Sequence, residues 1–190
     1  MWSFSHPWEK WPIAIPTPVV EGDWLFLSDA HTGSLLLRLN QQELAVEKVW
    51  HRRNDELDGQ STLHCLNSTP YIDGDYIYGA DNDGTLRCLR LDTGEQVWED
   101  SSAVPEHRFA TVHLVRQGDR TWLFNERGEL IMAQLSPSGY EEVSRAKLLD
   151  PTLEQLRRRG GVTWSHPAFA YRHIFARNDK ELVAADLSAR

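Results

Sequence analysis

The chain consists of short runs of apolar and aromatic residues that are interrupted by residues typical of turns. The clearest case begins at Thr69, where β-branched and aromatic side chains dominate residues 69–72 and 76–79. Asp73-Gly74-Asp75 separates the two runs, and its glycine supplies the positive φ that a tight hairpin turn requires. These residues therefore predict two antiparallel strands joined by a short hairpin.

Two further turns follow in the same stretch of chain. Asn82-Asp83-Gly84 predicts a second hairpin, and Asp92-Thr93-Gly94 predicts a third, which leads into a strand that ends at Trp98. Residues 69–98 are thus expected to form four short antiparallel strands, with Trp98 on the outermost one.

This pattern of strands and turns occurs four times. Residues 17–29 align without a gap on residues 69–81, and residues 114–130 follow the same template. A fourth copy, residues 166–182, keeps the strand pattern but lacks both turn glycines. The leucine after the second turn recurs at intervals of 51, 44 and 52 residues, at Leu35, Leu86, Leu130 and Leu182. The chain is therefore an array of structural repeats.

A four-stranded sheet that repeats at this spacing is typical of a β-propeller, because each sheet buries its faces by stacking on its neighbours around an axis. A β-sandwich would also contain many short strands, but it would not repeat one four-strand unit. We therefore predict an all-β fold, a partial β-propeller of about four blades, each a four-stranded antiparallel meander, within a single domain. The expected blades are residues 12–53, 62–104, 107–150 and 163–190, and the last lacks its outer strand.

Composition and charge narrow the possible partners. Hydrophobic residues make up 41% of the 190 residues, which is enough for an ordered core. The formal net charge of -8 argues against nucleic-acid binding, and we interpret the only basic cluster, Arg157 to Arg159, as a solvated loop.

No apolar window approaches the roughly 20 residues of a membrane-spanning helix. The N-terminal residues lack the pattern of a secretory signal, so we expect either a cytoplasmic chain or a longer gene product whose start is missing.

The two cysteines, Cys65 and Cys88, match neither a CxxC pair nor a zinc-ligand pattern. We interpret them as buried thiols, and a disulfide between them would require export of the chain.

The segment Cys88 to Trp98 resembles the tryptophan-docking motif of pyrroloquinoline-quinone (PQQ) repeat propellers, roughly A-x-D-x-x-T-G-x-x-x-W. Thr93, Gly94 and Trp98 match this motif, whereas Cys88 and Arg90 replace its alanine and aspartate. In that family the tryptophan docks across the gap between adjacent blades. The resemblance implies the same docking role for Trp98, and it places Trp50 and Trp2 at equivalent ends of other blades.

Residues 11–188 as a whole are similar to the C-terminal part of bacterial PQQ-like β-propeller proteins, the group described as similar to the outer-membrane assembly lipoprotein BamB. The resemblance implies seven or eight blades and an exported, periplasmic location. This chain has fewer blades, and Trp2-Ser3-Phe4 is expected to be the outer strand of a blade that is not present. Three arrangements follow: a fragment of a longer propeller, a homodimer in which two arcs close a ring, or a small closed monomer.

Quinone-dependent dehydrogenases of the related family use PQQ, a bound calcium, an aspartate base and a vicinal Cys-Cys disulfide. Because the two cysteines here are 23 positions apart, we expect neither PQQ nor another cofactor. An EF-hand frame on the acidic turn also fails, since Asp81 and Asp83 at ligand positions 3 and 5 would place Gly79 and Arg90 at positions 1 and 12. We therefore expect no metal site and no catalytic residues.

Histidines near the starts of inner strands are the remaining candidates for a site. We hypothesise that His64, His113 and His166 gather near the axis and form a small polar site with Arg108 and Glu126. The alternative is that each histidine is hydrogen-bonded separately. Two polar insertions, residues 52–67 and 150–161, interrupt the repeat and are expected to lie on one rim, the second with one or two helical turns.

The leading functional hypothesis is a non-catalytic scaffold that binds a protein or peptide on a rim, because propellers present many loops on rigid sheets. The alternative is an axial pocket that binds a small molecule or carbohydrate, and an enzyme is the least favoured class.

Overall fold

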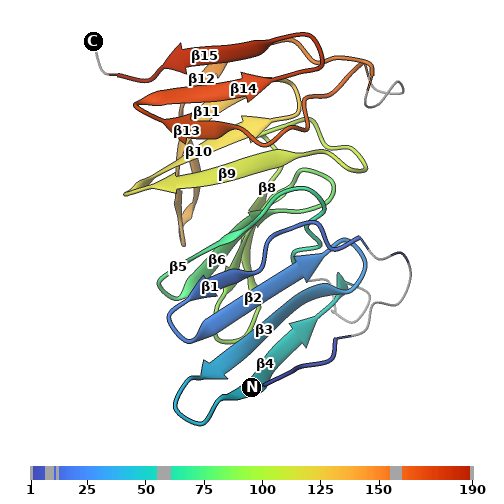
Figure 1. The fold of residues 1–190 in the computed structure, drawn as a ribbon, viewed down its shortest axis with the longest axis vertical. Coiled ribbons are helices and arrows are strands. Elements are labelled where there is room, and N and C mark those ends of the chain that lie inside the picture. Colours follow the sequence, from blue (N-terminus) through green and yellow to red (C-terminus); the bar gives the residue numbers. More distant parts are fainter. Residues whose placement is uncertain (1, 7–10, 12, 55–60, 155–159, 189–190) are drawn as a thin grey trace.

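The computed structural model describes residues 2–6, 11, 13–54, 61–154 and 160–188. The regular elements in these residues are β-strands, arranged as four antiparallel sheets that succeed one another from the bottom to the top of Figure 1. The predicted all-β partial propeller is therefore confirmed. The described part of the chain contains no helix long and apolar enough to cross a bilayer.

Each sheet is formed by consecutive strands that pair in sequence order, and we call the sheets blades 1 to 4. Blade 1 contains β1 (Val19–Glu21), β2 (Trp24–Asp29), β3 (Gly33–Asn40) and β4 (Ala45–Arg52). Blade 2 contains β5 (Tyr71–Asp73), β6 (Tyr76–Ala80), β7 (Leu86–Arg90) and β8 (Gln96–Asp100). Blade 3 contains β9 (Val112–Gln117), β10 (Arg120–Asn125), β11 (Glu129–Ser136) and β12 (Gly139–Lys147). Blade 4 has three strands in the described residues, β13 (Ala168–Ala170), β14 (His173–Arg177) and β15 (Leu182–Asp186).

The outer strand of the first three blades carries a β-bulge at the same position. The register shifts after Leu36, Cys88 and Met132, whose partners on the outer strands are Trp50, Trp98 and Ser144. A bulge increases the local twist and re-aims the next side chains. The two tryptophans therefore occupy one equivalent position, which a serine takes in blade 3.

Three apolar layers lie between consecutive blades. Phe26 and Leu36 of blade 1 pack with Ile77 and Leu89 of blade 2. The opposite face of blade 2 contributes Ala80 and Leu86 to a layer with Val112, Leu123 and Ile131 of blade 3. Phe124 and Leu130 then pack against Ile174 and Ala176 of blade 4. Since successive strand residues point to opposite faces, each central blade contributes to two layers.

The second turn of blades 1 and 3 needs glycine because another segment of chain passes very close to it. A Cβ on Gly33 would lie 2.2 Å from the backbone oxygen of Arg52, and one on Gly128 would lie 2.1 Å from that of Leu149. Both oxygens belong to the end of the outer strand or to the residues after it. Blade 4 has no described outer strand, and its corresponding turn at Asn178 contains no glycine.

Residues 2–6 form no strand, which differs from the outer strand expected at Trp2 to Phe4. The His6 ring instead lies edge-on to the His51 ring of β4, with centroids 5.0 Å apart, and Phe4 and His6 line a hollow together with Leu27 of β2. A strand requires a neighbouring edge with which to pair, whereas this segment lies against the face of blade 1.

The two insertions lie partly outside the described residues. Residues 55–60 and 155–159 are not described, so the expected helical turns and the Arg157 to Arg159 cluster lie there. Around the second insertion, Thr152 and Val162 pair as an isolated antiparallel bridge.

Candidate functional site

Trp50 of blade 1 docks onto the third turn of blade 2. Its side chain is 9% exposed, and Nε1 donates a hydrogen bond of 2.8 Å to the backbone oxygen of Leu91. The ring packs directly over Gly94, where an added Cβ would lie 2.9 Å from Trp50 Cε3. The backbone oxygen of Thr93 accepts a hydrogen bond of 2.6 Å from Arg52 Nε. Thr93 and Gly94 therefore receive the tryptophan of the preceding blade.

Trp98 makes the equivalent contact one blade further along. Its Nε1 donates a hydrogen bond of 2.7 Å to the backbone oxygen of Ser136, the last residue of β11. The ring lies 6.1 Å from the Tyr78 ring, centroid to centroid, and packs on the layer between blades 2 and 3. Trp2 occupies no such position, because it is 41% exposed in a segment without a strand.

His113 and His166 lie together between blades 3 and 4. Their ring centroids are 4.7 Å apart, and His113 Nε2 donates a hydrogen bond of 2.9 Å to the backbone oxygen of Trp164. Trp164 Nε1 in turn donates to Glu126 Oε2 at 3.0 Å. Trp164 thus links Glu126 to the two histidines.

Burial dominates the electrostatics of this group. His113 is 2% exposed, and burial lowers its pKa to about 4, with a smaller contribution in the same direction from His166. Glu126 is completely buried, and Arg127 Nη2 lies 3.7 Å from its Oε1. A neutral imidazole and a buried, bonded carboxylate are the arrangement expected of a structural polar cluster.

The other two candidates of the expected axial site lie in different surroundings. The backbone N–H of His64 donates to Asp81 Oδ1 at 2.9 Å, and its ring Nε2 accepts from the backbone N–H of Asn54 at 3.2 Å. Arg108 is exposed, and its guanidinium lies 4.6 Å from the ring centroid of its neighbour Phe109. The described contacts therefore join three of the five residues, His113, His166 and Glu126.

The acidic turn of blade 2 is held by an ion pair rather than open to a ligand. Asp81 and Arg87 are 4% and 6% exposed, and Arg87 Nε donates to Asp81 Oδ2 at 3.0 Å. Arg87 also pairs with Glu99 on β8. Within the described ranges, no three His, Cys, Asp or Glu side chains are arranged to hold a metal ion.

An Asp or Asn at the start of the second turn recurs in every blade, and our reading of the sequence missed it. In each blade its Oδ1 accepts backbone N–H groups of the turn, as Asn125 does from Arg127 at 3.0 Å and Asn178 from Lys180 at 2.8 Å. Such side chains satisfy turn backbone that would otherwise be unpaired. The signal was present in the repeat, at Asp29, Asp81, Asn125 and Asn178.

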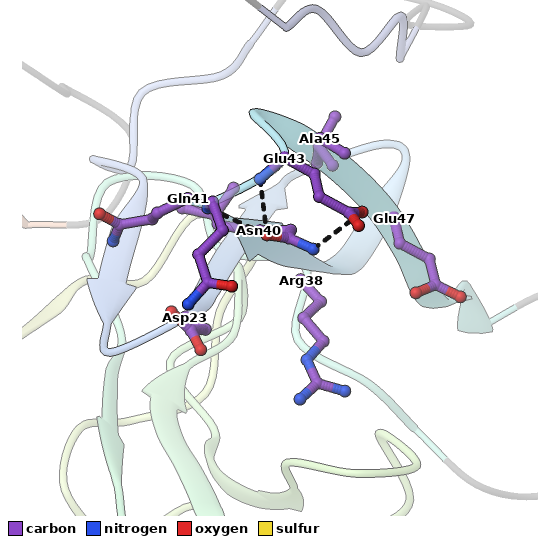
Figure 2. Close-up of a pocket in the computed structure, with 10 residues that line it drawn as sticks. Asp23, Arg38, Asn40, Gln41, Glu43, Ala45 and Glu47 are labelled. Atoms are coloured by element: carbon purple, nitrogen blue, oxygen red, sulfur yellow. Dashed lines mark hydrogen bonds between the residues drawn. The ribbon is translucent and has the colours of Figure 1, made fainter.

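A hollow of about 470 Å³ beside the β3–β4 turn is lined mainly by polar residues (Figure 2). Asn40 Oδ1 accepts the backbone N–H groups of Gln42 and Glu43, and Asn40 Nδ2 donates to Glu43 Oε2 at 3.2 Å. Figure 2 shows Arg38 directed away from these groups. The polar atoms of Asn40 therefore stabilise the turn.

The cysteines do not fit the arrangement that quinone-dependent dehydrogenases of the related family use. Cys65 lies in the layer between blades 1 and 2, whereas Cys88 lies on the opposite face of blade 2, opposite Trp98. Both are free and fully buried, and burial raises the pKa of each thiol to about 12. They therefore cannot form the vicinal disulfide of such a PQQ site.

No protein-family model and no curated protein match the sequence. Solved structures do match the fold. BamB from Moraxella catarrhalis superposes with a TM-score of 0.61 at 12% identity, over 91% of this chain and 46% of that chain. AztD from Citrobacter koseri gives a TM-score of 0.52 at 16% identity, over 93% of this chain and 44% of that chain. A quinohemoprotein alcohol dehydrogenase from Comamonas testosteroni gives a TM-score of 0.52 at 16% identity, over 86% of this chain and 28% of that chain.

The stacked four-stranded sheets and these superpositions show that the chain has the fold of an arc of a β-propeller, similar to the folds of BamB and of quinohemoprotein alcohol dehydrogenase. The relationship predicted from the docking motif is therefore confirmed at the level of the fold. The chain spans less than half the length of the three structures.

Proposed function

We propose that this chain is a non-catalytic propeller scaffold that binds a protein or peptide partner and works without PQQ or a resident metal. The observation that carries the proposal is the edge and outer face of blade 4, which no described strand covers. The partner classes include a second copy of the chain, through which two arcs could form a ring.

The outer face of blade 4 is apolar in its centre. Ile174 and Ala176 face blade 3, so the alternation of the strands places the row Ala168, Phe175 and Ala184 on the other side. Leu182 on β15 is 69% exposed. β15 also has no neighbour on its outer side among the described strands. Unpaired strand edges and exposed apolar faces are surfaces through which proteins associate.

The polar groups of the interior support a non-catalytic role. Asp81 is bonded to Arg87, Glu126 to Trp164, and the Asp29 carboxylate accepts the N–H groups of His31 and Thr32 at 2.8 Å. Each carboxylate is thus committed to a turn or to an interblade contact, whereas a reactive site requires groups aimed at a substrate.

Selection of peptides on the full chain tests the proposal. A phage library of random 12-residue peptides is panned on the immobilised protein, and binding of synthetic hits is measured by fluorescence polarisation. We expect hits that lose at least about tenfold in affinity with Leu182→Lys. Val143→Lys is the matched control, because Val143 is a 51% exposed strand residue on blade 3.

Enrichment of no peptide, together with binding of sugars or other small molecules, would contradict the scaffold function. Hits that bind both variants with equal affinity would support peptide binding by the protein, but at a site other than blade 4.

A further inference from the structure

A groove of about 320 Å³ lies between the tips of two hairpins, β9–β10 of blade 3 and β13–β14 of blade 4. Its lining includes Val115, Trp122, Phe169 and Leu187, with Arg116 and Arg172 among the polar residues. We call it the interblade groove. Both hairpins belong to the described chain, so the groove does not depend on what adjoins blade 4.

The apolar part of the groove is formed by two aromatic rings. Trp122 and Phe169 pack at a centroid distance of 6.2 Å with an interplanar angle of 36°, and both adjoin the layer between blades 3 and 4. Trp122 Nε1 already donates to Gln117 Oε1 at 2.7 Å. Since this polar atom is satisfied within the protein, the remaining ring surface suits an apolar group.

The turn at the rim of the groove is strained because residues other than glycine have positive φ in it. Tyr171 and Arg172 have φ values of 52° and 62°, and positive φ is costly for residues other than glycine. In the other three blades the residue equivalent to Tyr171 is a glycine with φ between 56° and 62°: Gly22, Gly74 and Gly118. The Tyr171 side chain is nevertheless 93% exposed, so it gains almost nothing from burial.

The same turn reverses the charge seen in its equivalents. The residue after the glycine is aspartate in the other three blades, at Asp23, Asp75 and Asp119, and arginine here. Positive charge at this tip stands out on a chain with a net charge of -8. An aromatic residue and an arginine thus replace Gly-Asp at the turn that borders an apolar groove.

Other charged groups lie near the groove on β9 and β15. Arg116 on β9 pairs with Asp73 Oδ1 of blade 2 at 2.8 Å. Asp186 on β15 lies opposite His173, and its pKa is lowered by hydrogen bonds from Ser188 and, to a smaller extent, by His173 and Arg172. Arg172 makes no ion pair with another described residue, so it is the cation best placed to meet an external carboxylate.

We propose that the interblade groove binds an extended peptide segment in which a large apolar side chain is followed or preceded by Asp or Glu. The apolar side chain lies on Trp122 and Phe169, Tyr171 covers it, and Arg172 pairs with the carboxylate. This inference rests on the proposed scaffold function and specifies one of its sites.

A peptide fits these features better than a nucleic acid does. Polyanion binding requires several unpaired cations, whereas the groove offers Arg172 beside an Arg116 that is already paired, on an acidic protein. A single carboxylate next to an apolar group matches one arginine next to aromatic rings.

The decisive variant converts the turn to that of the other blades, Tyr171→Gly with Arg172→Asp. It relieves the positive φ of tyrosine, so the protein should fold at least as stably as the wild type in urea denaturation.

The probe is a fluorescein-labelled peptide, Gly-Glu-Asp-Phe-Asp-Glu-Gly, and a peptide with Lys in place of each acidic residue is its control. Indole N–H signals in ¹H–¹⁵N NMR report the location, with Trp122 assigned from Trp122→Phe.

We expect the acidic peptide to bind, to shift the Trp122 indole signal and to lose at least about tenfold in affinity in the double variant, which corresponds to about 1.4 kcal/mol. Arg177→Asp makes the same charge change at the other end of β14 and should leave affinity within about twofold. Absence of binding, equal binding of the lysine peptide, or equal binding to the double variant would overturn the inference. Tighter binding of a single-stranded oligonucleotide at the same place would overturn the choice of a peptide.

The unbiased peptide selection separates the two proposals. If it yields peptides while the acidic probe peptide does not bind, or binds the double variant equally well, the scaffold function stands and the groove assignment fails. If it yields no peptide, the acidic probe does not bind and the protein binds sugars or other small molecules instead, both fail.

Discussion

Gly94 and Trp50 come from different blades and meet at one interface, although the motif that suggested docking lies entirely in blade 2. At this scale the role of a residue is set by the neighbour it contacts. Gly94 has φ of 70° and also lies against Trp50, whereas Gly74 has φ of 57° and no atom within 4 Å of an added Cβ. Alanine substitutions at these two glycines therefore separate the free-energy cost of backbone strain from that of a steric contact.

Gly94→Ala should therefore destabilise the protein by about 2–4 kcal/mol, against about 1 kcal/mol for Gly74→Ala. The difference arises because only the first alanine would push on a docked ring. Urea denaturation followed by tryptophan fluorescence measures both free energies of unfolding. Equal losses in the two variants would show that Gly94 is needed for its backbone conformation alone.

His113 should make stability depend on pH. Its pKa is about 4 in the folded protein and 6.5 ordinarily, so the unfolded chain binds more protons between these values. Its contribution is complete above pH 6.5 and is lost as the pH falls toward 4. We expect this histidine to reduce the free energy of unfolding by about 2 kcal/mol between pH 7.5 and pH 5.

The measurement is urea denaturation at both pH values, with His113→Gln as the comparison. When the pH falls from 7.5 to 5, the free energy of unfolding of the glutamine variant should fall by about 2 kcal/mol less than that of the wild type. A wild-type loss that the variant reproduces in full would assign the pH dependence to other groups.

At the scale of elements, the outer strands join the blades through a tryptophan at one bulge-related position. Trp50 and Trp98 each bridge to the next blade, and Ser144 takes the place of a third tryptophan in blade 3. Blade 4 packs on blade 3 without this contact and relies on the layer that contains Phe124 and Ile174.

Trp98→Ala should cost roughly 3 kcal/mol or more, because it removes a ring packed between blades and leaves the Ser136 carbonyl without its partner. Trp11→Ala is the control, since Trp11 is 71% exposed and its loss should change stability by about 0.5 kcal/mol or less. Thermal and urea unfolding give both values. A change below about 1 kcal/mol for Trp98→Ala would refute its docking role.

At the scale of the molecule, the two ends of the arc differ. On blade 1, Leu35 and Leu37 are 1% and 3% exposed although Leu36 between them faces blade 2, and residues 4 and 6 line a hollow on that blade. On blade 4, the face that contains Phe175 and the edge of β15 have no described cover.

We therefore expect the purified chain to associate through blade 4. Light scattering after size exclusion should give a mass above 21.9 kDa, and a discrete species near twice that value would indicate two arcs closing a ring. Ala184→Lys, in the centre of the uncovered face, should reduce the association. A monomer that binds no hydrophobic dye would contradict an uncovered apolar face.

The sequence by itself determined the hairpins, the repeat and hence the propeller. These features are local: Gly74 sets a turn between strands that pair a few residues apart, and β-branched and aromatic residues alternate along each strand. Even the Asx residues of the second turns were readable from the repeat, at Asn125 and Asn178 for example.

Only the tertiary structure decided which side chains meet between blades. Trp50 bonds to a residue 41 positions away, Trp98 to one 38 away and His113 to one 51 away. No local pattern distinguishes His113, which joins His166, from His64, which bonds near Asp81. Such pairings follow from how sheets stack in space, because stacking is directed by the apolar area of whole faces, and therefore they cannot be read from the order of the residues.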